Sequence, residues 1–221
     1  MKNKKLQSII AVGLMAALCF VGNYMQIKIP NGVLITRIHF GNSMCLLAGL
    51  LFGGLNGGLA SGIGASLYDL FDPVYIVSSP FTFLSKFAMG FVCGKMAKSA
   101  HRIKNETAHI LTTAIVGQIV YIILYLAKTF VSQLILGYTI ETALTATATN
   151  LLTSSVNAII AVAVSVPLYF GLKKPLASTY FSTLINEREE AKSNRKTQII
   201  TAIIFIIIAI AAAIFGTLMK K

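Results

Sequence analysis

The sequence predicts an all-α integral membrane protein, a bundle of six transmembrane helices with an additional seventh C-terminal helix, and three observations support this fold class. Only 12% of the 221 residues are charged and 56% are apolar, whereas a soluble domain carries about a quarter charged residues. The apolar residues form stretches suited to a hydrocarbon core about 30 Å thick. The lysines and arginines behind the net charge of +12 lie at the ends of these stretches, as membrane orientation requires. Nucleic-acid binders spread basic residues along a solvated face, so no nucleic-acid partner is expected.

Seven apolar stretches define the expected helices in chain order: 8–27, 41–52, 55–70, 80–97, 108–130, 147–171 and 197–219. The first stretch follows a basic N-terminus and lacks a small-residue cleavage site, which indicates an uncleaved first span. A single helix over 41–70 would be about 45 Å long and would overshoot the bilayer core. The glycine-rich residues 53–58 provide a break, so two short or tilted helices are predicted there.

The distribution of lysine and arginine supports this break. With a cytoplasmic N-terminus, the inner segments 1–7, 53–58, 95–107 and 172–196 hold three, zero, four and six basic residues. The outer connections hold only Lys28 and Arg37. This asymmetry follows the positive-inside tendency. We therefore predict a six-helix membrane domain over 1–175, a charged cytoplasmic linker over 176–196 and an additional transmembrane helix within 197–221.

Lys86 is the most informative single residue. It lies six residues into the stretch that begins at Pro80, and a charge at the centre of a membrane helix costs about 2.5–3.5 kcal/mol on insertion scales. Such a residue normally faces a cavity or a partner, although a lysine side chain also reaches the interface by snorkelling. We favour the cavity, with Thr82 one turn before Lys86 as a further hydrogen-bonding group.

Three further groups of polar or aromatic residues are predicted near the outer ends of the helices. Asn150, Thr153, Ser154 and Asn157 are spaced to share one helix face, which indicates either a ligand site or interhelical hydrogen bonding. The other two groups are Tyr121, Tyr125 and Lys128 in the fifth stretch and Tyr68, Asp69 and Asp72 at the end of the third. Aromatic rings, amides and a few charges together suit a small polar aromatic ligand.

Small residues mark two further features. Several of the glycines between Gly49 and Gly64 stand four apart, a spacing that lets helix backbones approach closely. Gly13 and Ala17 are likewise four apart in the first stretch. That smooth face suits either a helix of a partner subunit or packing within this chain.

Catalytic and metal-binding patterns are not found in the sequence. The three histidines do not form HExxH, no GxSxG setting for a nucleophile occurs, and the three cysteines show no CxxC spacing. We therefore expect no enzyme activity, no cofactor and no metal site, and we expect the cysteines to be buried as small apolar residues. A nucleotide motif is also missing, so active transport would draw its energy from another protein or an ion gradient.

Over residues 8–175 the chain resembles the substrate-binding S component of an energy-coupling factor (ECF) vitamin transporter, nearest the riboflavin-type branch. The resemblance rests on the first helix, on the segments LLAGLLFGGLNGGLASGIGASLYDL and SPFTFLSKFAMGFVCGKMA, and on ATNLLTSSVNAIIAVAVSVPLY. Riboflavin members carry an Asn and, three residues later, a Lys in the last helix; Asn150 matches the first, and Thr153 stands at the second. The seventh stretch lies outside the six-helix pattern of the family.

The resemblance implies a subunit that binds a vitamin near the outer surface of the bacterial plasma membrane and docks through Gly13 and Ala17 onto a transmembrane coupling subunit driven by two ATPases. The expected ligand is a B6 vitamer, a hydroxymethylpyrimidine-type thiamin precursor or riboflavin. An ion-coupled secondary transporter that works alone is the alternative. The predicted substrate-binding residues are Arg37, Asn42, Tyr68, Asp69, Thr82, Lys86, Tyr125, Asn150, Thr153 and Asn157.

Overall fold

The structure, a computed structural model, describes residues 3–31, 34–99 and 105–186. The chain divides after residue 188 into two units, and all the described residues belong to the first. The predicted helix at 197–219 and the later part of the predicted linker lie outside the described residues.

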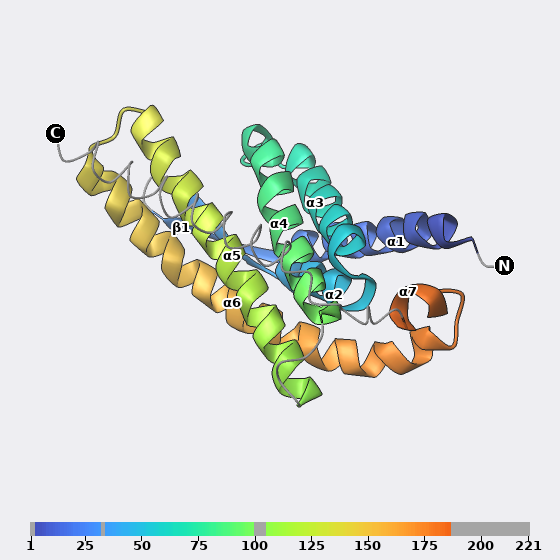
Figure 1. The fold of residues 1–221 in the computed structure, drawn as a ribbon. Helices are drawn as coiled ribbons and strands as arrows, with labels where there is room; N and C mark the ends of the chain where they lie inside the picture. Colours follow the sequence, from blue (N-terminus) through green and yellow to red (C-terminus); the bar gives the residue numbers. More distant parts are fainter. Residues whose placement is uncertain (1–2, 32–33, 100–104, 187–221) are drawn as a thin grey trace, which may run out of the picture. The chain divides into compact units, whose positions relative to one another are not determined.

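Six helices correspond to the first six predicted stretches (Figure 1), and the last two of them extend beyond the predicted limits at both ends. They are α1 Lys4–Tyr24, α2 Gly41–Phe52, α3 Gly54–Phe71, α4 Ser79–Lys98, α5 Glu106–Ile135 and α6 Ile140–Ala177. By length and composition, α1, α5, α6 and the segment Ile76–Lys98 that contains α4 are long and apolar enough to cross a membrane. The predicted all-α membrane class is therefore confirmed. Helix α2 has 12 residues and is only about 18 Å long.

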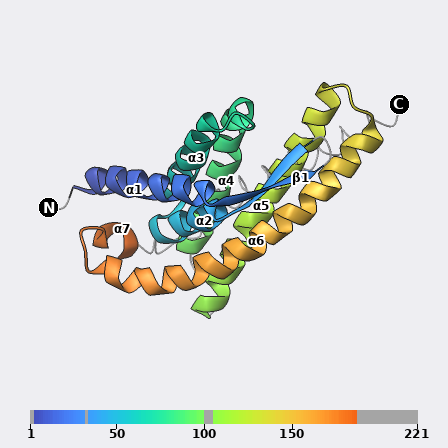
Figure 2. The same cartoon turned by 180° about the vertical axis from the view of Figure 1, so that it is seen from behind.

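A two-stranded hairpin joins α1 to α2, which the sequence analysis did not predict. Strand β1, Gln26–Asn31, pairs antiparallel with β2, Leu34–His39, and Lys28 stands opposite Arg37. Strand β2 packs against α6, and Figure 2 shows β1 in the view from behind. We call the end of the bundle that carries this hairpin the hairpin end, and the opposite end, where α2 turns into α3, the Gly53 end.

The predicted break between the second and third stretches is a single residue. Gly53 has φ +82°, a left-handed conformation that L side chains rarely adopt, and α3 begins at Gly54 directly after it. The remaining glycines of 53–58 therefore lie inside α3. They serve close helix packing rather than the reversal of the chain.

That close packing is visible at three contacts of α3. A Cβ on Gly57 would lie 2.4 Å from the Cα of Gly49 in α2, and one on Gly64 would lie 2.2 Å from the carbonyl oxygen of Ala16 in α1. A Cβ on Gly94 of α4 would lie 2.5 Å from the backbone nitrogen of Gly54. The predicted close approach of backbones is therefore confirmed within the bundle. The cysteines Cys19, Cys45 and Cys93 are free thiols and fully buried there, as expected.

The chain continues beyond the bundle into a short helix, α7 Ser182–Asn186. The side-chain amide of Gln7 donates to the carbonyl oxygen of Tyr180 at 2.5 Å, and Lys98 Nζ donates to the carbonyl oxygen of Leu184 at 2.6 Å. The first part of the predicted linker thus packs against the Gly53 end of the bundle.

Candidate functional site

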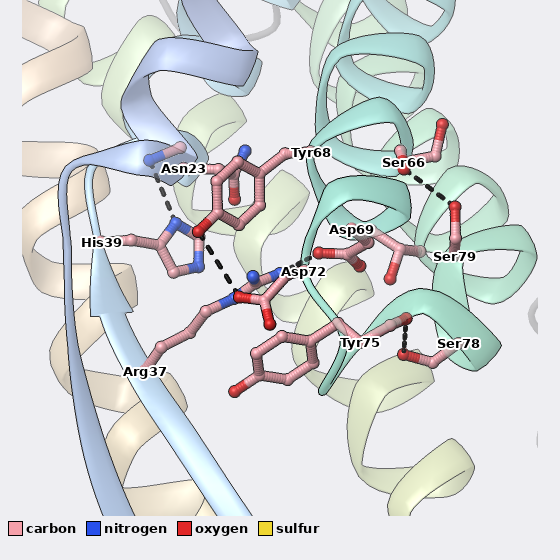
Figure 3. A network of polar contacts seen from close by, with 12 residues as sticks. Asn23, Arg37, His39, Ser66, Tyr68, Asp69, Asp72, Tyr75, Ser78 and Ser79 are labelled. Atoms are coloured by element: carbon pink, nitrogen blue, oxygen red, sulfur yellow. Dashed lines mark hydrogen bonds and ion pairs between the residues drawn. The ribbon is translucent and has the colours of Figure 1, made fainter.

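A buried ion pair attaches the hairpin to the end of α3. Arg37 on β2 lies 2.6 Å from Asp69, and the two side chains are only 11% and 1% exposed. The Arg37 guanidinium also lies over the ring of Tyr75, 4.1 Å from its centroid, and 5.3 Å from the centroid of Tyr68. Figure 3 shows these side chains converging between β2 and α3. The pair therefore fixes where β2 sits on the helices.

A second ion pair lies beside the first. Lys28 on β1 is 2.7 Å from Asp72, which follows α3. Asp72 also accepts hydrogen bonds from the Tyr68 hydroxyl at 3.5 Å and from the backbone N–H of Val74 at 3.1 Å. Burial raises the pKa of Asp72, but its hydrogen bonds with Lys28 and Val74 outweigh burial and leave the pKa below its ordinary value. Both strands are thus tied to the end of α3.

Asn157 connects the same strand to α6. Its Oδ1 accepts from the backbone N–H of His39 at 3.0 Å, and its Nδ2 donates to the carbonyl oxygen of Arg37 at 2.7 Å. One amide therefore makes both a donor and an acceptor contact with the backbone of β2. This arrangement is the one that an additional strand would make, so Asn157 stabilises the edge of the hairpin against α6.

His39, at the end of β2, is buried and neutral. Its Nδ1 accepts a hydrogen bond from the backbone N–H of Gly41 at 3.0 Å, which assigns the ring proton of the neutral form to Nε2. Burial lowers the pKa of His39 well below its ordinary value, and the nearby cations Lys86 and Arg37 lower that pKa further. His39 thus lies in the field of two positive charges.

Acid is expected to destabilise the protein through His39. In the folded state the pKa of His39 is depressed, so its stabilising contribution is complete above the unfolded-state pKa of about 6.5 and is lost as the pH falls below that value. The thermal midpoint of the detergent-solubilised protein should therefore fall between pH 7 and pH 5. The contribution of this residue to the free energy of unfolding falls by at most about 1.4 kcal/mol per pH unit.

The control for this prediction replaces each of two buried histidines by asparagine. In His39→Asn the amide Oδ1 takes over the acceptor position of Nδ1, and the pH dependence below 6.5 should weaken. His109 contacts the carbonyl oxygen of Met96 at the other end of the bundle, and His109→Asn should keep the loss of stability below pH 6.5 that the native protein shows. Equal pH slopes in native protein and His39→Asn would contradict the assignment.

Lys86 is buried inside the bundle, where it is 1% exposed. Its Nζ donates to Oδ1 of Asn42 on α2 and lies 3.9 Å from the centroid of the Tyr121 ring on α5. The Nδ2 of Asn42 in turn donates to Oε1 of Gln118 at 3.4 Å. Because α4 begins at Ser79, Lys86 lies about 10 Å along the helix from the hairpin end. Its ammonium group stays inside the bundle and does not snorkel to the surface.

The face of α6 predicted from spacing is buried as expected. Asn150, Ser154 and Asn157 are at most 6% exposed, while Thr153 is half-buried. Asn150 donates to the Thr129 hydroxyl of α5 at 3.4 Å, and the rings of Tyr121 and Tyr125 stack along α5 with centroids 5.8 Å apart. Polar and aromatic groups of α5 and α6 therefore face each other in the hairpin half of the bundle.

The predicted residues thus form two groups at the hairpin end. Arg37, Tyr68 and Asp69 meet between β2 and α3, and Asn42 and Lys86 meet between α2 and α4. Asn157 joins the first group through the backbone of β2. Thr82, Tyr125 and Thr153 are half-buried on α4, α5 and α6.

Sequence reasoning missed four residues of these groups: Lys28, His39, Tyr75 and Gln118. Gln118 could have been found, because it stands three residues before Tyr121 and seven before Tyr125 and so extends their helix face. The other three lie in connections between helices, where helical spacing carries no signal.

The predicted docking residues lie on the outside of α1. Gly13 and Ala17 are exposed, whereas Ala11, Met15 and Cys19 on the opposite face are buried. A Cβ on Gly13 would meet no atom within 4 Å. Of the two interpretations of this smooth face, packing within the chain therefore does not apply to the described residues.

Within residues 3–31, 34–99 and 105–186, histidine, cysteine and acidic side chains do not gather in groups of three or more that would hold a metal ion.

Sequence comparison relates the chain to a known family and to a protein of another organism. The sequence profile of the family described as "ECF-type riboflavin transporter, S component" matches residues 3–174. An "Uncharacterized protein in gap 3'region" of Pyrococcus woesei is 30% identical over 107 residues, which cover 48% of this chain and 68% of the relative.

Proposed function

The chain belongs to the family of ECF-type riboflavin transporter S components, and from this premise we propose that it binds a water-soluble vitamin or vitamin precursor at the hairpin end of its helix bundle. As an S component it is the substrate-capture subunit of an ECF transporter in the membrane. The proposed ligand is a B6 vitamer, a thiamin precursor or riboflavin.

The observation that carries the proposed site is the buried polar group around Lys86. A leucine at this position would stabilise an apolar bundle better than a buried ammonium group does. Lys86 is nevertheless almost fully buried, and its partners Asn42 and Tyr121 are neutral. The side-chain nitrogen of Gln118 is buried beside them without a hydrogen-bond partner in the described structure. A polar ligand would satisfy these donors.

The roles we propose for the site residues follow from their contacts. Lys86 and Gln118 donate to the ligand, and Asn42 orients both of them. Tyr121 and Tyr125 offer ring faces on α5 for an aromatic ligand. The remaining predicted residues with a proposed ligand contact are Thr82, Tyr68, Asn150 and Thr153.

The residues that hold β2 have a different proposed role. Arg37, Asp69 and Asn157 already bind one another or the hairpin backbone. We propose that they position the hairpin over the site, so that His39 and the start of α2 stay next to Lys86. The ligand itself is captured without covalent chemistry.

Import also needs partners, because the chain has no nucleotide motif. Membership of the family implies association with an ECF energising module. We propose that this module consists of a transmembrane coupling subunit and two ATPases, and that the exposed Gly13 and Ala17 face of α1 contacts the coupling subunit. The charge distribution supports a cytoplasmic N-terminus in the plasma membrane, with the hairpin end outside.

The first test is mass spectrometry of small molecules released from the purified, detergent-solubilised protein. We expect a vitamin or precursor at near one-to-one stoichiometry. A protein that releases no small molecule and shows no thermal shift with a panel of B vitamins would contradict the proposal.

The second test measures the affinity of the released compound for Lys86→Ala and Asn150→Ala. Each substitution should weaken binding about tenfold or more, because the loss of one hydrogen bond from a charged or buried group costs at least about 1.4 kcal/mol. Asn56→Ala is the matched control. Asn56 is a half-buried amide that contacts Ser8 at the Gly53 end, so its replacement should leave the affinity unchanged. Unchanged affinity in both site variants would refute the site.

A further inference from the structure

The ionisable groups around Lys86 do not balance in charge. Arg37 is neutralised by Asp69, and Lys28 is neutralised by Asp72. His39 is neutral because its Nδ1 accepts a hydrogen bond. Among the described residues, Lys86 has no carboxylate within 4.0 Å. The third ion pair of these residues joins Lys173 to Glu106 near the Gly53 end. Lys86 therefore carries a positive charge without a carboxylate partner among the described residues.

The groups next to Lys86 do not compensate for this charge. Asn42 presents only a carbonyl dipole, and Tyr121 presents a ring face. Such neutral contacts stabilise an ammonium group but leave its charge in place. Taking a lone charge out of water is unfavourable by several kcal/mol unless an opposite charge joins it. An anion bound beside Lys86 would supply the missing opposite charge.

The hydrogen-bonding groups without partners agree with this sign near Lys86. The Nδ2 of Asn42 donates to Oε1 of Gln118, which leaves Nε2 of Gln118 as a buried donor without a partner in the described structure. The NH1 group of Arg37 is a second such donor. Acceptors without partners also occur at the hairpin end: Asp69 Oδ2, whose carboxylate is already bound to Arg37, and the amide oxygens Asn23 Oδ1 and Gln26 Oε1. Donors without partners suit an anionic acceptor.

From this arrangement we infer that the protein selects a vitamin or precursor that carries an anionic group, a carboxylate or a phosphate monoester, which Lys86 binds as its ion-pair partner. The inference rests on the proposed function and narrows it, because it prefers acidic or phosphorylated forms over the neutral vitamins. Lys86 is then the residue that determines specificity, with Gln118 as a second donor.

The test compares matched neutral and anionic ligands on the full-length, ligand-free protein in detergent. The pairs are pyridoxal with 4-pyridoxate, pyridoxine with pyridoxine 5′-phosphate, and riboflavin with riboflavin 5′-phosphate, each measured by calorimetry. In at least one pair the anionic member should bind ten times more tightly or better. A preference confined to 4-pyridoxate would identify a carboxylate, and a preference confined to the phosphorylated compounds would identify a phosphate monoester.

The variant Lys86→Gln separates charge from hydrogen bonding. Its preference for the anion should fall below about threefold, whereas Lys95→Gln, at the exposed end of the same helix, should keep the native preference. Neutral members that bind the native protein as tightly as their anionic partners would overturn the inference while leaving vitamin capture intact. If no compound in any pair binds and none is released from the purified protein, both the inference and the proposed function fail.

Discussion

Replacement of Asp69 by alanine is expected to lower the free energy of unfolding by about 3–5 kcal/mol, which corresponds to a fall in the thermal midpoint on the order of 10 °C. The guanidinium of Arg37 would lose its carboxylate. Its side chain, which is 11% exposed in the native structure, would remain among the rings of Tyr68 and Tyr75. Removing one partner of a buried pair leaves an uncompensated charge, and this costs more than the intact pair contributes. Heating the detergent-solubilised protein and measuring the folded fraction by size exclusion gives the midpoint.

Two controls distinguish this effect from the general loss of a carboxylate. Glu106 pairs with Lys173 where the side chains are 38% and 28% exposed, so Glu106→Ala should change stability by about 1 kcal/mol or less. The double variant Arg37→Met, Asp69→Leu removes both charges and should recover most of the loss. A single Asp69→Ala variant as stable as Glu106→Ala would show that Arg37 is not held by Asp69.

The helices could be predicted because lipid imposes a simple rule on the sequence. A crossing segment needs a long apolar stretch, and the predicted limits of 41–52 coincide with those of α2. A break within 53–58 was predicted from the same constraint on length. The spacing of the glycines did not show how few of them turn the chain. Glycine suits both a left-handed turn and a close helix contact, so spacing alone does not distinguish the two uses.

The candidate site was predicted where helical spacing carried the signal. Asn150, Ser154 and Asn157 fell on one buried face because offsets of four and seven return to the same side of a helix. The spacing did not reveal that Asn157 binds the backbone of β2. That contact depends on the hairpin. Its strands are so short that the sequence does not distinguish them from an ordinary connection between helices.

The sequence also did not predict which charged residues pair with one another. Arg37 and Asp69 are 32 positions apart and come from different elements, so only the fold decides that they meet. The position of His39 between Arg37 and Lys86 has the same origin. The sequence indicates which charged residues lie within a membrane protein. The three-dimensional structure shows which of them have no partner of opposite charge.

The glycine contacts give the second large effect, which Gly57→Ala is expected to reveal. The new Cβ would lie 2.4 Å from the Cα and 2.7 Å from the backbone nitrogen of Gly49, so α2 and α3 must separate. Backbone atoms cannot rotate away as a flexible side chain does, and overpacking of this kind costs about 1–3 kcal/mol. The thermal midpoint should therefore fall by several degrees.

Gly171→Ala provides a control with the opposite sign. Gly171 is exposed in the interior of α6, and a Cβ there would meet no atom within 4 Å. The same substitution should then stabilise the helix by about 0.5–1 kcal/mol, because alanine restricts the unfolded chain more than glycine does. If helix propensity alone governed these positions, both variants would raise the midpoint. A fall for Gly57→Ala together with a rise for Gly171→Ala would show that the backbones of α2 and α3 are in direct contact.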